Sequence, residues 1–248
     1  MRYLLLCLAF SALVPATFAA KEQTTPISEF MKLARNPYPV SSYAALEGEV
    51  RHLRRGGRPE TVPIYFGIIL QPERMTGQII LDGREGYMLG QTRRSGSSET
   101  TVVPMKSNTG DAGSENRLGH MGIRPSDLTM SFLYYPVVRE LESESVRTVP
   151  CRVVLLESPD KKEQVKVYIA RDYHFPLKAE FFEGAAAGGT PFRTLEINSF
   201  RKSDGFYYTD RVGLFGPGWR TSIEFDKSAA VGKFDPARPP KVIRPLAK

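Results

Sequence analysis

Cysteine, histidine and long apolar runs are scarce in this chain of 248 residues, which has two cysteines and three histidines. Cys7 lies in an N-terminal segment that we expect to be removed, so Cys151 would have no partner for an intramolecular disulfide. Beyond residue 20, no stretch is long and apolar enough to predict a transmembrane helix. We therefore expect the rest of the chain to depend on one hydrophobic core.

The first segment has the features of a secretory signal peptide. Residues 1–20 begin with Arg2, continue with an apolar run and end with small residues around Ala19. This order is typical of a cleaved leader. We therefore predict a signal peptide over 1–20, a single domain over 21–232, and a basic, proline-rich tail over 233–248. The mature protein is expected in the periplasm, with secretion as the alternative.

The residues that usually mark catalysis are missing as motifs. No G-x-S-x-G elbow is present, and His52, His120 and His174 stand in no local signature of a Ser-His-Asp arrangement. Cys151 shares its strand parity with Val149 and Val153, which indicates a small buried side chain rather than a nucleophile. The sequence predicts no enzyme.

Metal and cofactor sites are also not indicated. The candidate ligands Asn108, Asp111, Glu115 and His120 are scattered through a glycine-rich segment that reads as a mobile loop, without the paired spacing of a zinc site or the order of a calcium loop. The spaced glycines of "GREGYMLG" and "GLFGPG" do not join a strand to a long helix, so they are interpreted as turns. We expect no metal and no cofactor.

The formal net charge of +7 is clustered rather than spread evenly. Arg51, Arg54 and Arg55 lie in "RHLRRGGRP", and further basic residues lie in the tail. Such patches fit lipid head groups or a protein partner, and transient contact with a membrane surface follows from the first of these. Export argues against nucleic acid. The favoured interpretation is a solvated hairpin tip and a loose tail.

Short amphipathic helices are predicted at three places. Thr25 and Pro26 precede an i, i+3, i+4, i+7 stripe that ends at Ala34. A capped turn is expected from Ser126 to Leu133, and a second helical turn over 137–141.

The remainder of the chain predicts β-strands separated by turn residues. "IYFGIIL" is apolar on both faces and is expected to be covered on both. Strands with short connections favour an antiparallel meander that closes into a curved sheet or barrel. The predicted class is mainly β with short helices.

One run of segments resembles the LolA-like family of outer-membrane lipoprotein-sorting proteins. It comprises "SDLTMSFLYYPVVRELESESVRTVPCRVVLLESP", "VKVYIARDYHFPLKAEFFE" and "RTLEINSFRKSDGFYYTDRV". The resemblance implies an incomplete, strongly curved antiparallel β-barrel with a helical lid, whose apolar concavity receives lipid or lipoprotein acyl chains. The residues expected to line it are Phe66, Ile68, Leu70, Ile79, Leu81, Leu177, Phe181, Trp219, Ile223 and Phe225.

Three functions stay open at this point. The first is a non-enzymatic periplasmic carrier or binder of acyl chains. The second is a regulatory or scaffold module, RseB-like, that binds another envelope protein through a sheet edge or the basic hairpin. The third is an enzyme whose activity depends on His120 or His174. The same alternation of side chains also fits a fully packed interior without a cavity.

Overall fold

A computed structural model describes residues 25–36, 40–94, 97–105, 116–184, 188–225 and 229–246. The expected signal peptide lies outside these residues, as do Asn108, Asp111 and Glu115. Among the described helices, none has the length and apolarity needed to cross a membrane.

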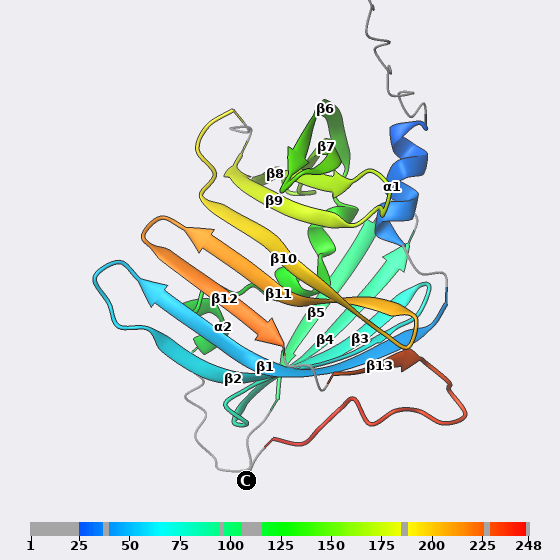
Figure 1. Cartoon of the computed structure of the whole chain (residues 1–248), viewed down its shortest axis with the longest axis vertical. Coiled ribbons are helices and arrows are strands. Elements are labelled where there is room, and N and C mark those ends of the chain that lie inside the picture. Colours follow the sequence, from blue (N-terminus) through cyan, green and yellow to red (C-terminus); the bar gives the residue numbers. More distant parts are fainter. Residues whose placement is uncertain are drawn as a thin grey trace, which may run out of the picture.

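The architecture is a single curled sheet of 13 strands whose neighbours all pair antiparallel (Figure 1). The strands are β1 (Ser42–Arg54), β2 (Glu60–Leu70), β3 (Arg74–Leu81), β4 (Glu85–Arg94), β5 (Ser97–Pro104), β6 (Val137–Val146), β7 (Val149–Glu157), β8 (Glu163–Ala170), β9 (Pro176–Glu183), β10 (Arg193–Ser203), β11 (Phe206–Gly216), β12 (Trp219–Phe225) and β13 (Ala230–Lys233). The predicted meander and the predicted incomplete barrel are both confirmed.

The order of strands explains why the barrel stays open. The sheet runs β5-β4-β3-β2-β1-β12-β11-β10-β9-β8-β7-β6, and β13 pairs with β1 beside this path. Pairing of β1 with β12 joins two meanders, in each of which strands that follow one another in the chain pair as neighbours. The two ends of this order, β5 and β6, are not paired with each other, so the sheet curls without closing.

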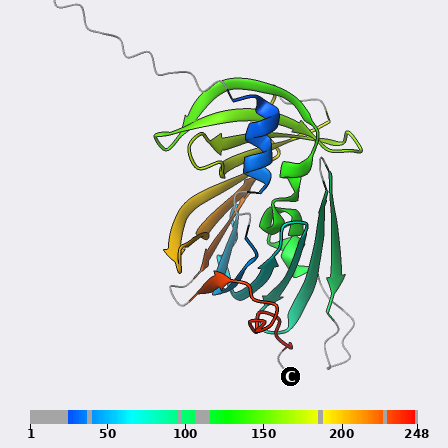
Figure 2. The same ribbon diagram turned by 90° about the vertical axis from the view of Figure 1, so that its right-hand side faces the viewer.

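Four short helices in the described part of the chain lie on the concave side of the sheet or across one end of it. They are α1 (Ile27–Arg35), α2 (Arg117–His120), α3 (Pro125–Thr129) and the 3₁₀ helix η1 (Ser131–Tyr134). Figure 2 shows the green helical segment between the yellow and orange strands on one side and the teal strands on the other. The insertion between β5 and β6 therefore occupies the middle of the half-barrel.

The main hydrophobic core lies between this insertion and the inward faces of the strands. Phe132 of η1 packs edge-on against Phe181 of β9, with ring centroids 5.4 Å apart. Leu118, Met121 and Ile123 of the insertion are at most 2% exposed. The predicted stripe of α1 is confirmed, because Phe30, Met31 and Ala34 are all buried in this core.

One helix prediction is wrong. Residues 137–141 form the first half of β6 rather than a helical turn. Val137 and Val138 are exposed, and the strand is held by ladder pairing to β7 and by ion pairs such as Glu140 with Arg152. An edge strand that buries little has no clear period of two, so its glutamates and valines imitate a helix.

The outward face of β2 is covered by the chain's own C-terminal tail. Tyr65 donates a 2.7 Å hydrogen bond to the carbonyl of Val242, and Gln78 exchanges two hydrogen bonds with the backbone of Arg244. The red segment after β13 in Figure 1 runs back beneath β1 and β2. The prediction that β2 is covered on both faces is confirmed, and the expectation of a loose tail is wrong for residues 241–246.

A second, smaller core lies on the outward face of the other half. Cys151, Val153 and Tyr168 are buried there, with Leu141 and Leu177 packed against them. Burial raises the pKa of the Cys151 thiol. Cys151 is therefore a packing residue, as its strand parity predicts.

Candidate functional site

An apolar cavity of about 230 Å³ lies between the sheet and the inserted helices. Strands β1, β2 and β12 supply Ala44, Phe66 and Phe225 to its wall, and the insertion supplies Leu128 and Leu133. The sheet residues share one strand parity, which turns them to the concave face. The cavity is thus bounded by two different parts of the fold, the sheet and a set of short helices.

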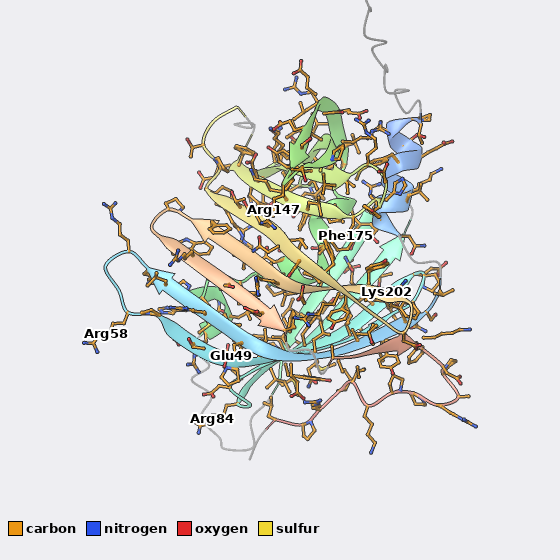
Figure 3. The ribbon with its side chains drawn as sticks, in the orientation of Figure 1. Glu49, Arg58, Arg84, Arg147, Phe175 and Lys202 are labelled. Carbon is orange, nitrogen blue, oxygen red and sulfur yellow. The ribbon has the colours of Figure 1, made fainter. Side chains whose placement is uncertain are left out.

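Aromatic side chains stiffen this wall. Phe66 and Phe225 stack with their ring centroids 6.4 Å apart. Phe175, labelled in Figure 3, precedes β9 and packs edge-on against Phe200 at 4.8 Å. Such pairs contribute about 0.5–1.5 kcal/mol beyond their buried area, so this wall is not expected to collapse into the cavity.

The residues expected to line an acyl site fall into three groups. Phe66, Ile68, Leu70 and Phe225 line the apolar cavity. Another four belong to the same core but lie outside the cavity wall and are at most 1% exposed: Ile79, Leu81, Phe181 and Ile223. The last two, Leu177 and Trp219, lie elsewhere.

A β-bulge accounts for the position of Leu177. The register between β8 and β9 shifts here, because Tyr168 pairs with Lys178 while Ile169 pairs with Pro176. The extra residue reverses the alternation, so Pro176 faces the apolar cavity and Leu177 packs in the outer core. A strict period of two would place both Leu177 and Phe181 inward.

The helical wall is fastened to α1 by Arg35. Its Nε donates to the carbonyl of Leu133 at 2.8 Å, and its Nη2 donates to the carbonyl of Tyr135 at 3.0 Å. In return, the hydroxyl of Tyr134 donates to the carbonyl of Arg35 at 2.7 Å. The end of α1 and η1 are therefore joined by three hydrogen bonds and form one unit of the wall.

Buried charges fasten α3 to the sheet. Asp127 of α3 pairs with Arg193 of β10, and both side chains are at most 5% exposed. Arg124 adds an ion pair to Glu163 of β8 at 2.7 Å. Breaking a buried pair is costly when one charge is left without its partner. These two ion pairs therefore oppose separation of α3 from β8 and β10.

Burial shifts the pKa of both members of the Asp127–Arg193 pair. It raises the pKa of Asp127 to about 6, although Arg193 and the backbone N–H of Arg124 act in the opposite direction. It also lowers the pKa of Arg193, with Asp127 opposing. Oδ1 of Asp127 and the hydroxyl of Thr129, both in cavity-lining residues, are buried and have no hydrogen-bond partner among the described residues.

A second pocket, of about 300 Å³, lies at the other end of β1. We call it the basic pocket, and its lining residues are His52, Arg54, Gly119, His120, Gly122, Arg124, Phe192, Arg193 and Trp219. Four stretches of chain meet here: the end of β1, the segment 119–124, the start of β10 and the start of β12. The insertion therefore separates the basic pocket from the apolar cavity.

The basic hairpin does not present its arginines as one surface. Arg51 and His52 are neighbours on β1 and face opposite sides, so Arg51 is exposed while His52 is buried. Arg54 returns to the inner side at the rim of the basic pocket. Arg55 lies in the turn, where its backbone N–H donates to Gly218 at 2.7 Å.

Two of the histidines make contacts with neighbouring side chains. His52 is hydrogen-bonded to the hydroxyl of Thr221 at 2.8 Å, and that hydroxyl donates to the carbonyl of Met121. His174 packs against Phe30 with ring centroids 5.0 Å apart. Within the described ranges, no three His, Cys, Asp or Glu side chains come together as metal ligands.

Comparison with known proteins gives a likeness in structure alone. No known protein family and no curated protein matches the sequence. A DUF1329 family protein from Desulfovibrio piger superposes with a TM-score of 0.61 at 14% identity, over 85% of this chain and 94% of that one.

Two further structures agree. A putative outer membrane lipoprotein-sorting protein domain from Vibrio parahaemolyticus gives a TM-score of 0.60 at 15% identity, over 82% of this chain and 91% of that one. A LolA superfamily protein from Nitrosomonas europaea gives 0.51 at 13% identity, over 84% and 93%. The protein has a LolA-like fold.

Within this LolA-like fold, the basic pocket is the feature that sequence reasoning missed. His52, His120 and Arg193 are far apart in the chain, and none of them stands in a motif. The only local signal was the arginine cluster around Arg54. The pairing of Asp127 with Arg193 left no sequence signal either, since it depends on how the insertion is seated.

Proposed function

We propose that this protein is a non-enzymatic periplasmic carrier or binder of lipid or lipoprotein acyl chains, with the apolar cavity as its site. The observation that carries the proposal is a hollow lined by apolar side chains, with Phe66 and Leu128 on opposite walls. The lipoprotein-sorting domain among the structural relatives supports this class of cargo. The signal peptide predicted over 1–20 supports the compartment.

The energetics favour an acyl guest. Each methylene transferred from water into an apolar site contributes about 0.8 kcal/mol. The cavity of about 230 Å³ is smaller than the ~300–1,000 Å³ of sites that hold drug-sized ligands. It therefore fits a segment of one chain, and a longer guest requires α3 and η1 to move away from the sheet.

Such a movement has to break the charged contacts of the insertion. Asp127–Arg193 and Arg124–Glu163 hold α3, while Arg35 holds η1. The same movement would expose apolar side chains such as Phe132, which the insertion buries in the main core, so a guest that fills the cavity must offset both losses by burying its own surface.

A filled-cavity variant tests the proposal. Ala44 lines the cavity and its neighbour Ala45 faces the other side of β1, so Ala44→Phe and Ala45→Phe add the same ring on opposite faces. A fluorescent fatty acid is titrated into each folded variant. We expect at least tenfold weaker binding for Ala44→Phe and little change for Ala45→Phe. Equal binding by both variants would contradict the proposal.

A second function, binding of another envelope protein, has its own supporting observation. The edge strand β6 exposes Val137 and Val138, at 37% and 47%, and an unpaired edge can accept an added strand. A partner bound there would be lost with Val138→Lys, and a partner bound at the hairpin would be lost with Arg54→Glu and Arg55→Glu together. Acyl binding should survive the Val138→Lys change.

A further inference from the structure

The basic pocket holds more positive than negative charge. Three arginines, Arg54, Arg124 and Arg193, line it beside the imidazoles of His52 and His120, and no aspartate or glutamate does. Arg193 and Arg124 each have one carboxylate partner behind the wall, Asp127 and Glu163.

Arg54 has no carboxylate partner among the residues described. Its side chain donates to Nε2 of His52 at 3.3 Å and to the carbonyl of His120 at 3.1 Å, and its Nη2 lies 3.4 Å from Nδ1 of His120. A cleft lined by charge of one sign concentrates ions of the other sign. The excess of cations therefore favours an anion in this pocket.

The titration of neighbouring groups agrees with a positive local field. Burial lowers the pKa of His52, and Arg54 and His120 lower it further, while Glu60 opposes them. Glu60 is itself hydrogen-bonded to Arg117 at 3.0 Å. The carboxylate that opposes them at His52 is therefore already engaged by another arginine.

One donor in the wall is unused. Arg193 is 4% exposed, and its Nε–H has no hydrogen-bond acceptor among the described residues. A buried donor without an acceptor costs about 1–3 kcal/mol. Small displacement of this side chain toward an anion in the pocket would satisfy that donor.

Trp219 forms a fixed aromatic wall beside these cations. A Cβ built on Gly122 or Gly216 would lie 2.6 Å or less from the indole, so both glycines are needed for the ring to sit where it does. The guanidinium of Arg193 lies 5.7 Å from the indole centroid. The pocket is thus a shaped site that combines an apolar plane with convergent donors.

We propose that the basic pocket binds a phosphoryl group, carried either by free phosphate or by a phosphate ester of a lipid head group. Its donors come from three directions, with Arg54 on β1, Arg124 before α3 and Arg193 on β10. A planar carboxylate is satisfied by one arginine fork, whereas a tetrahedral dianion accepts hydrogen bonds from several sides. The phosphoryl proposal does not depend on the acyl proposal, and a separate measurement tests it.

The chain supplies its own reporter, because Trp219 is its only tryptophan. Tryptophan fluorescence of the folded protein is recorded at constant ionic strength during titration with inorganic phosphate, with short-chain phosphatidic acid below its micelle concentration, and with the matching uncharged diacylglycerol. A saturable change with at least one phosphate-bearing probe, and none with diacylglycerol, is expected. Binding of inorganic phosphate would identify free phosphate as the source, and binding of phosphatidic acid alone would identify a head group.

Two matched variants decide whether the pocket is responsible. Arg54→Gln should weaken phosphate binding about tenfold, as expected for loss of one charge-assisted hydrogen bond. Arg58→Gln removes the same charge from the outer tip of the same hairpin (Figure 3) and should bind like the wild type. If Arg54→Gln does not fold, Arg124→Gln takes its place. No saturable response to either phosphate probe, or equal affinities in the pocket variant and Arg58→Gln, would overturn the proposal.

Discussion

The two pockets of this half-barrel use the same face of the same strands for opposite chemistry. Along β1, Ala44 and Leu46 contribute to the apolar cavity, while His52 and Arg54 line the basic pocket eight residues further on in each case. The sheet therefore fixes which side chains point inward, and their position along the strand decides what they meet. A continuous concave face is divided into two environments by the insertion between β5 and β6.

The insertion itself shows the same division. Leu128 and Leu133 face the apolar cavity, and His120 and Arg124 face the basic pocket. The Asp127–Arg193 pair joins the two, because Asp127 lines the first pocket and Arg193 lines the second. Four substitutions separate these contributions, in order of decreasing expected effect.

Phe132→Ala, a change on the apolar side of the insertion, should lower the stability of the protein most. Phe132 is 1% exposed and packs on Phe181, and truncation of a buried phenylalanine costs about 3–5 kcal/mol. Chemical denaturation measures this loss. A loss below about 1 kcal/mol would mean that η1 contributes little to the core.

Asp127→Asn tests the ion pair that lies between the two pockets, and the quantity measured is the change of the unfolding free energy with pH. Burial raises the pKa of Asp127 to about 6, so the folded state binds a proton more tightly than the unfolded state. The stabilising contribution of this group is therefore complete below its ordinary pKa of about 4 and is lost as the pH rises through about 6. We expect up to about 3 kcal/mol over this window, as an order of magnitude.

Comparing the wild type with Asp127→Asn isolates the contribution of the Asp127 carboxyl to stability. The unfolding free energy of the wild type minus that of Asp127→Asn should fall between pH 4 and pH 6 and be flat above. Denaturation curves at a series of pH values measure the difference. Parallel profiles for the two proteins would show that Asp127 keeps an ordinary pKa.

Gly122→Ala acts on the basic side alone. Gly122 has a φ of +70° and its added Cβ would meet the Trp219 ring, so we expect a loss of about 1–3 kcal/mol and a shifted tryptophan emission. Gly205→Ala is the control, because it has a φ of +81° and open space around it. Gly205→Ala should lower the stability without shifting the tryptophan emission. Identical emission spectra for Gly122→Ala and Gly205→Ala would argue against a fixed Trp219.

Tyr65→Phe should have the smallest effect, because it lies on the outer face and touches neither pocket. It removes the 2.7 Å hydrogen bond to Val242 and should cost about 1 kcal/mol, with the tail becoming more sensitive to protease. Tyr173→Phe, at a side chain that is 76% exposed, should change neither property. Equal melting temperatures and equal digestion rates would mean that the tail is not held by this contact.

Strands that bury one face could be predicted from sequence, because alternation and turn residues specify them locally. Turns with a positive φ at Gly56 and at Asp82 join β1 to β2 and β3 to β4. Residues 137–141 could not be placed, since an exposed edge strand carries no alternation. Leu177 was assigned to the wrong face of its strand because a bulge is a property of the pairing with β8 and leaves no mark in the period of β9 itself.

The sites depended still more on tertiary contacts. The four cavity-lining residues predicted by strand parity lie beside helical residues whose seating no local pattern determines. The basic pocket joins residues separated by more than a hundred positions, such as His52 and Arg193. Sequence reasoning could therefore give the inward face of the sheet, and it could not give the two chambers into which the insertion divides it.

The most direct test of acyl binding is mass spectrometry of the lipid extracted from the purified mature protein, with Ala44→Phe prepared in parallel. The proposed function predicts acyl-bearing molecules in roughly one-to-one amount with the wild type and far less with the variant. Repeated extraction of wild-type protein without any acyl-bearing material, from a preparation shown to be folded, would contradict it.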